Sequence, residues 1–240
     1  VATDVLGRLI EVVSGQRLDQ FIGERILRPL GMTDTRWWVS GDDVDRLAAL
    51  YIPGPTGGLS RYDLLGDEAL REPTLLAGGA GLISTAADYH RFTQMLLREG
   101  AYDPPTTGAD ASGDAASGDA AAGGQGGRPH RLLGSRTVRY MVENHLPGGA
   151  DLQQLSTGGF AETNFEGIGF GFGFAVLLDP VPSKTMGTPG QYYWGGVAST
   201  AFWVDPAEEL TVLFFTQLMP SSTYPIRPQL RQLIYPALID

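Results

Sequence analysis

Residues 191–217 read QYYWGGVASTAFWVDPAEELTVLFFTQ, and this stretch decides the fold class. Its aromatic and β-branched residues predict two strands, and DPAEE at 205–209 predicts the tight turn between them. The segment GIGFGFGFAVLLDP, which begins at residue 167, predicts one strand before these two. Three consecutive strands with a short last connection are typical of an antiparallel meander.

Two glycines, Gly195 and Gly196, interrupt the aromatic sequence directly after Trp194. Glycine weakens a strand interior, where it usually marks a bulge or a place that a ligand or another backbone approaches closely. Taken alone, the bulge is the commoner of these two interpretations. The rest of the chain has to decide between them.

Apolar residues at helical spacing predict helices before and after the strands. The first is expected to end at Gly15, the second starts near Leu18, and a third has Ser84 or Thr85 as its N-terminal cap. The apolar stripes of the first and last helices are Val5, Leu6, Leu9, Ile10 and Val13, and Ile226, Leu230, Leu233 and Ile234. Helices, then a meander, then a terminal helix predict the α+β class.

Composition and charge exclude several classes of function. The 240 residues carry a net charge of −10, and nucleic-acid binding needs a clustered positive patch instead. There is no cysteine, so disulfides, thiolate nucleophiles and cysteine-bound zinc are excluded. The longest apolar runs are far too short to span a membrane. The cellular compartment stays open.

Residues 101–129 form a low-complexity segment of alanine, glycine, aspartate and serine. Such a composition buries too little apolar surface to offset the entropy lost on ordering. We therefore expect a disordered surface insertion here. Because a helical pattern resumes after it, we expect residues 1–240 to belong to one domain.

Common motifs for metals and nucleotides are missing. The three histidines, His90, His130 and His145, are not at metal-ligand spacing, and GFGFGF does not fit a dinucleotide-binding loop. We therefore predict no metal and no cofactor. SKTMG at 183–187 looks like a Lys-Thr-Gly triplet, but Lys184 lies in a proline-rich loop rather than on a strand.

Four segments in this order resemble the serine β-lactamases and penicillin-binding-protein-like hydrolases. The likeness is greatest to the class C-like branch that includes the family VIII carboxylesterases, and it covers nearly the whole chain except the insertion. The segments are ATDVLGRLIEVVSGQRLDQFIGERILRPLGMTDT at 2–35, GGAGLISTAADYHRFTQMLLREG at 78–100, GFGFAVLLDP at 171–180 and YYWGGVASTAFWVDPAEELTVLFFTQLMPSS at 192–222.

The resemblance implies an acyl-enzyme mechanism and assigns the residues around Trp194. In the esterase branch a Trp-Gly-Gly triplet often replaces Lys-Thr-Gly, and here Trp194, Gly195 and Gly196 match it. By correspondence, the Val197 N–H is an oxyanion-hole donor, and the two glycines keep the cleft open for the acyl group. Tyr193 is expected to contribute to substrate binding.

The family's Ser-x-x-Lys pair and its catalytic tyrosine are absent. Lys184 is the only lysine, and Val181 stands three residues before it. By correspondence, Val1 is the third residue of the tyrosine triplet and borders the substrate. We therefore expect the nucleophile, the lysine and the tyrosine to precede Val1, so that this chain is an inactive C-terminal portion of a longer enzyme. The missing N-terminal segment, in the same chain or as a separate one, is its expected partner.

Trp194 in place of a lysine favours neutral esters or amides over anionic substrates, because no charge is available there to pair with a carboxylate. Two other hypotheses remain. One is a non-catalytic binding or sensor domain of the same fold. The other is a carbohydrate-binding module in which Tyr192, Tyr193 and Trp194 form a stacking platform.

Overall fold

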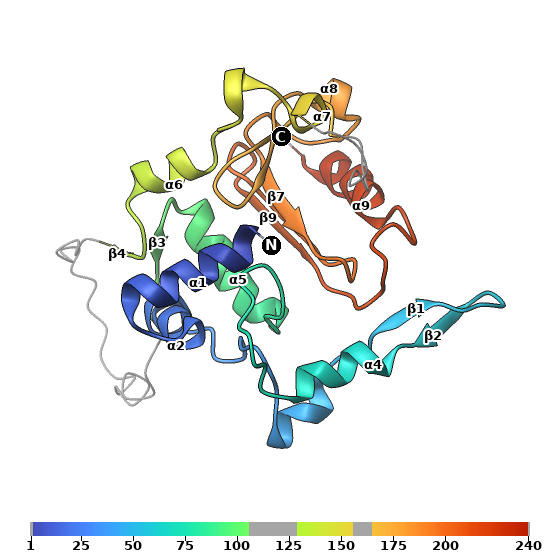
Figure 1. Cartoon of the computed structure of the whole chain (residues 1–240). Helices are drawn as coiled ribbons and strands as arrows, with labels where there is room; N and C mark the ends of the chain where they lie inside the picture. Colours follow the sequence, from blue (N-terminus) through green and yellow to red (C-terminus); the bar gives the residue numbers. More distant parts are fainter. Residues whose placement is uncertain (1, 106–128, 156–164, 240) are drawn as a thin grey trace, which may run out of the picture.

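The computed structural model describes residues 2–105, 129–155 and 165–239. Its main sheet is antiparallel and five-stranded, in the order β5-β6-β7-β8-β9 (Figure 1). These strands are Ile168–Phe170 (β5), Ala175–Leu177 (β6), Tyr192–Gly195 (β7), Ala201–Asp205 (β8) and Leu210–Phe214 (β9). Two small hairpins stand apart from it: Tyr51–Pro53 (β1) with Leu59–Arg61 (β2), and Ala101–Tyr102 (β3) with His130–Arg131 (β4).

The helices of the described residues cover the sheet and form the N-terminal region. The α-helices are Ala2–Ser14 (α1), Leu18–Ile22 (α2), Arg28–Leu30 (α3), Asp63–Gly66 (α4), Ala86–Leu97 (α5), Ser135–Met141 (α6), Leu152–Leu155 (α7), Pro180–Ser183 (α8) and Ile226–Ile234 (α9). A π-helical turn at Gly23–Leu27 joins α2 to α3, and 3-10 turns occupy Gly41–Arg46, Asp67–Leu70, Pro147–Gly149 and Tyr235–Ala237.

The α+β class and the meander order are confirmed, but the predicted number of strands was wrong. Two of the three expected strands are each divided by a turn, so the sheet has five strands. The first turn contains Gly173 at φ +93°, and the Gly171 N–H donates to the Phe174 carbonyl over 2.8 Å. The second turn follows Gly195. Gly173 and Gly196, which the sequence predicts as strand interior, therefore lie in turns. At Gly173 the left-handed φ explains the glycine, because glycine adopts it at little steric cost.

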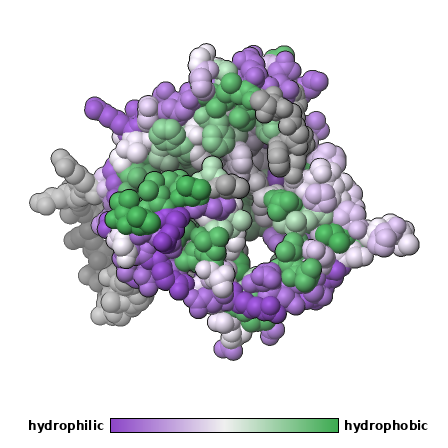
Figure 2. Space-filling view, viewed as in Figure 1, coloured by the Kyte–Doolittle hydropathy of each residue, from purple (hydrophilic) through white to green (hydrophobic). Residues whose placement is uncertain are grey.

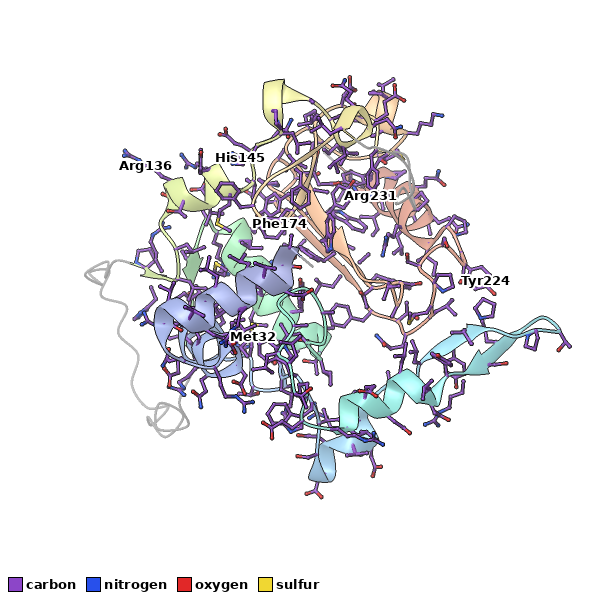
Figure 3. All side chains as sticks on the ribbon, in the orientation of Figure 1. Met32, Arg136, His145, Phe174, Tyr224 and Arg231 are labelled. Atoms are coloured by element: carbon purple, nitrogen blue, oxygen red, sulfur yellow. The ribbon has the colours of Figure 1, made fainter. Side chains whose placement is uncertain are left out.

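The strand β8 lies at the centre of the core, with all five of its residues buried. On one face of the sheet, Tyr192, Phe202 and Val204 pack with Met95 and Leu96 of α5. On the other face, Trp203 and Tyr193 meet Arg231 of α9. Figure 3 labels Phe174 and Arg231, which mark these two faces. The alternation of side chains along the strands thus places helices on both sides.

The N-terminal cap predicted for the third helix is confirmed. The Thr85 hydroxyl accepts from the Asp88 N–H over 3.2 Å at the start of α5. The buried carboxylate of Asp88 accepts from the Thr35 hydroxyl at 2.9 Å and the Asp34 N–H at 2.7 Å. These contacts attach the loop after α3 to the start of α5.

The apolar stripes of the first and last helices are less buried than their spacing suggests. On α1 only Gly7 is buried, whereas Val5, Leu6, Leu9, Val12 and Val13 are each at least half exposed. Figure 2 shows these green hydrophobic side chains along the surface of α1. On α9 Leu233 is 72% exposed and Arg231 is 5% exposed, so an arginine rather than a leucine faces the sheet.

The prediction of disorder for residues 101–129 was wrong at Ala101 and Tyr102, which form β3 and pair with Arg131 and His130. Residues 106–128, on which the prediction of disorder chiefly falls, lie outside the described residues. Among the helices that are described, none combines the length and the apolar character needed to cross a membrane.

Candidate functional site

The strand β7 is paired along its whole length on one side only. Its partner β8 spans Tyr192 to Gly195, whereas β6 pairs with Tyr192 and Tyr193 alone. Trp194 and Gly195 therefore extend past the end of β6. Their backbone edge on that side is free of a neighbouring strand in the described sheet. An uncovered strand edge is where a ligand can meet main-chain donors.

Trp194 offers an exposed aromatic surface at this edge. Its side chain is 47% exposed, and its indole meets the Phe170 ring edge to face at 5.5 Å. This packing fixes one side of the indole and leaves the rest accessible, a suitable surface for an apolar group.

The structure does not bring Tyr193 to the same face as Trp194. Tyr193 is half-buried on the α9 side, where the Arg231 guanidinium lies 5.0 Å from its ring, and burial raises the pKa of its phenol. Tyr192 is 1% exposed and packs against Phe174. The stacking platform proposed for a carbohydrate-binding module therefore does not form, because alternate residues of a strand point to opposite faces.

A compact turn connects β7 to β8. The Gly196 N–H donates to the Thr200 carbonyl at 3.0 Å, and the Ser199 N–H donates back to the Gly196 carbonyl at 3.1 Å. Ser199 has φ +68°, and its hydroxyl donates to the Leu218 carbonyl at 2.6 Å. The Leu218 N–H donates to the Ala198 carbonyl at 3.1 Å. The turn is thus fixed by its own hydrogen bonds and by those between its last residues and Leu218.

Val197 occupies the second position of this turn. Its side chain is 54% exposed. Within the described residues its N–H donates to no protein acceptor. A backbone donor that is accessible and not already used by the fold can bind an oxyanion.

Both glycines after Trp194 are required by packing, for a reason that the sequence did not reveal. A Cβ on Gly195 would lie 2.5 Å from Nη2 of Arg227 and 2.8 Å from the Thr200 carbonyl oxygen. A Cβ on Gly196 would lie 2.5 Å from the Thr200 hydroxyl. The absence of a side chain at Gly195 therefore leaves space for Arg227 of α9, and the absence of one at Gly196 leaves space for Thr200 within the turn. That the glycines also leave room for an acyl group stays a prediction.

Behind the strand, a buried polar cluster attaches α9 to the sheet. The carboxylate of Asp205 is fully buried and accepts from Thr188, from Gln191 and, at 2.6 Å, from the Tyr235 hydroxyl. Arg231 donates to Gln191 and lies 4.5 Å from the Trp203 ring. Burial lowers the pKa of Arg231 and raises that of Tyr235, since desolvation penalises the charged form of each.

Two further predicted positions fall elsewhere. Val1 lies outside the described residues. Lys184 is exposed, has a left-handed backbone conformation and lies at the end of α8 rather than on a strand. This position agrees with the interpretation that SKTMG is not the family's Lys-Thr-Gly triplet. Cavities of about 370 and 460 Å³ lie beside α5 and beside α8, and neither is lined by residues of the turn after Trp194. The candidate site is an open edge of the sheet.

Arg227 is the residue of this region that sequence reasoning missed. Its Nη2 donates to the Gly196 carbonyl at 2.8 Å and to the Thr200 carbonyl at 3.1 Å. The four-residue spacing of Arg227 and Arg231 could have placed both on one helix face. Nothing in the sequence indicates that this face meets the glycines.

Comparison with known proteins identifies the family and the fold of the chain. The sequence profile of the beta-lactamase family matches residues 1–235. The esterase EstB of Burkholderia gladioli is 30% identical over 98% of this chain and 53% of its own length. Protein Rv1367c of Mycobacterium tuberculosis is 31% identical over 91% of this chain and 48% of its own. The chain thus spans about half the length of these relatives.

A solved structure shows the same fold. EstCE1, described as a hydrolase with promiscuous acyltransferase activity, superposes with a TM-score of 0.67 at 26% identity, covering 98% of this chain and 55% of its own. The family profile, the esterase relative and the helix-covered antiparallel sheet lead to one conclusion. The chain belongs to the beta-lactamase family, which unites serine β-lactamases, penicillin-binding-protein-like hydrolases and related esterases.

Proposed function

We propose that this chain forms the oxyanion-binding and acyl-binding wall of a serine hydrolase that acts on neutral esters or amides through an acyl-enzyme. The observation that carries the proposal is the Val197 N–H, which no acceptor among the described residues uses, beside the half-exposed Trp194 at an uncovered strand edge. Removing one donor from an oxyanion hole typically lowers kcat by about 100- to 1000-fold.

The nucleophile of the proposed enzyme lies on a segment outside these 240 residues. The chain contains no Ser-x-x-Lys, and the relatives that it matches are about twice as long. The uncovered apolar side chains of α1 support this proposal, because a contiguous exposed apolar surface usually marks an interface. In the full-length enzyme the lysine and the tyrosine take the proton of the serine hydroxyl while its oxygen bonds to the carbonyl carbon. The C=O π bond breaks, and the Val197 N–H stabilises the negative charge on the former carbonyl oxygen.

Trp194 favours a neutral substrate with an apolar acyl group. Its indole gives an aromatic surface and one N–H donor but no positive charge. The cation closest to the glycines, Arg227, directs its Nη2 to two main-chain carbonyls on the opposite face of the turn. A substrate carboxylate would therefore not find Arg227 on the exposed side of Trp194, which supports a preference for neutral substrates.

A serine-directed fluorophosphonate probe tests the proposed chemistry. The full-length protein is expected to react at one serine, and that serine should lie in a Ser-x-x-Lys sequence before Val1. The isolated 240-residue chain should not react. If the full-length protein stays unlabelled while folded, the non-catalytic binding domain becomes the better description.

Replacing Val197 by proline tests the oxyanion donor directly. Proline removes the N–H and replaces the isopropyl side chain with a ring, and the second position of a β-turn accepts its fixed φ. In the full-length enzyme V197P should lower kcat for a neutral ester by about 100- to 1000-fold. V197A keeps the N–H and should stay within about twofold of the parent. Equal activities of the two variants, at equal thermal stability, would exclude the donor role.

A further inference from the structure

Arg227 of α9 contacts the turn after Trp194, and this contact bears on the proposed oxyanion donor. We propose that Arg227 is a positioning residue that fixes the peptide group between Gly196 and Val197, so that the Val197 N–H is held facing away from α9. This inference rests on the function proposed above and assigns a second residue to the same site.

The direction of the N–H follows from the geometry of the peptide bond. The Gly196 carbonyl and the Val197 N–H belong to one planar peptide group, and in a trans peptide they point in opposite directions. Arg227 Nη2 lies 2.8 Å from that carbonyl oxygen. A carbonyl held toward α9 therefore orients the N–H of the same group toward the opposite side, away from the guanidinium.

The charge of Arg227 makes this orientation specific. If this peptide group rotated by 180°, the Val197 N–H would point at the guanidinium in place of the Gly196 carbonyl. The N–H hydrogen and the guanidinium both carry positive charge, so this orientation is disfavoured. Charge-assisted hydrogen bonds are roughly twice as strong as neutral ones. The Ser199 N–H also donates to the Gly196 carbonyl, so a neutral donor and a charged donor hold the same oxygen.

Gly195 makes the approach of Arg227 possible. Its absent side chain leaves the space that the guanidinium occupies, since a Cβ would lie 2.5 Å from Nη2 and 2.6 Å from Cζ. The same Nη2 donates to the Thr200 carbonyl at 3.1 Å, on the other side of the turn. The guanidinium thus links the two ends of the turn, and it fits there because Gly195 has no side chain.

Substitution of Arg227 in the full-length enzyme tests the inference. R227M keeps the aliphatic length and removes the donors, and it should lower kcat for a neutral ester by about 10- to 100-fold, part of the loss typical of a missing oxyanion donor. KM should stay within about twofold, since ground-state binding by Trp194 is unchanged. R227K retains a charged donor and should recover most of the lost kcat.

The matched control is R136M, because Arg136 on α6 is exposed and points outward from the molecule (Figure 3). It should leave kcat unchanged. If R227M lowers only the melting temperature and keeps kcat per folded molecule, or if R227K is no better than R227M, Arg227 is a structural residue and the inference is wrong.

An activity-independent measurement separates this inference from the proposed function. In the full-length protein, NMR should show the Gly196 carbonyl-carbon and Val197 amide shifts moving in R227M and staying near their parent values in R227K and R136M. Unmoved shifts in R227M would overturn the positioning role even if the enzyme is active. A serine probe that fails to react, or an active V197P, would overturn the proposed function instead.

Discussion

Gly195 and Gly196 stand next to each other in the sequence but serve different neighbours. Gly195 leaves space for the guanidinium of Arg227, whereas Gly196 leaves space for the hydroxyl of Thr200. Neither has a left-handed backbone, so the need for glycine here is one of space rather than of φ. Trp194 is half exposed to solvent, whereas the two glycines that follow it leave space on the side of the turn that faces α9.

Gly195→Ala is expected to lower the free energy of unfolding by about 1–3 kcal/mol, the usual range when a buried site is overfilled. The new methyl group must displace either Arg227 or the Thr200 carbonyl. Thermal unfolding of the chain measures the effect. Gly23→Ala is the control, because nothing lies within 4 Å of its Cβ position and it sits in a helical turn. Equal melting temperatures for the two variants would contradict the packing role.

A buried polar cluster joins α9 to the main sheet, in addition to apolar contacts. The helix α9 presents Arg231 to the sheet, where it contacts Gln191 and the rings of Tyr193 and Trp203. Asp205, at the end of β8, lies fully buried in the same cluster and accepts from Tyr235 directly after α9. The opposite charges of Asp205 and Arg231 and the hydrogen bonds that each makes offset part of the cost of burying these groups.

Asp205→Asn should cost about 3 kcal/mol, since it leaves the buried Arg231 without its neighbouring negative charge and gives the Tyr235 hydroxyl a weaker acceptor. Chemical denaturation followed by circular dichroism would measure the change. Glu208→Gln makes the same acid-to-amide change at an exposed position three residues on and should alter stability little. A small effect at Asp205 would mean that apolar packing alone holds α9.

At the scale of the whole molecule, the apolar side chains along α1 are the main departure from an ordinary globular surface. Leu6 and Leu9 are each 54% exposed, in a helix whose only buried residue is Gly7. A soluble chain rarely exposes such a continuous stripe unless another surface covers it. We propose that an N-terminal segment of the full-length enzyme covers this stripe.

Leu9→Gln separates the isolated chain from the full-length protein. In the isolated 240 residues it should leave the melting temperature unchanged or reduce self-association, because the side chain is already exposed. In the full-length protein it should destabilise the fold by about 2 kcal/mol or more, as expected for a polar group in a formed interface. Leu233→Gln, 72% exposed on α9, should be neutral in both. Neutrality of Leu9→Gln in the full-length protein would exclude α1 as an interface.

Alkaline unfolding is expected between pH 10 and 12. Burial raises the pKa of Tyr89 from 10.0 to about 12, and it also raises the pKa values of Tyr192, Tyr193 and Tyr235. Because the neutral phenols are favoured in the folded state, their contribution is complete below pH 10 and is lost as the pH rises through the folded pKa values. Tyrosinate absorbance and circular dichroism should change together, and Tyr89→Phe should shift the transition to higher pH.

The sequence by itself determined the fold class, the order of helices and strands, a cap at Ser84 or Thr85 and the family, because these depend on local periodicity, capping and ordered motifs. It also predicted Trp194 and Gly195 on a strand, which the structure confirms, whereas the prediction for Gly196 was wrong because β7 ends at Gly195. The donor role of Val197 stays a prediction. The tertiary structure decided that the glycine-rich segments turn, that Tyr193 lies against Arg231 of α9, and that Arg227 packs against the turn after Trp194. The physical reason is that contacts between residues about thirty positions apart depend on how α9 crosses the sheet, and no local pattern of residues specifies that crossing.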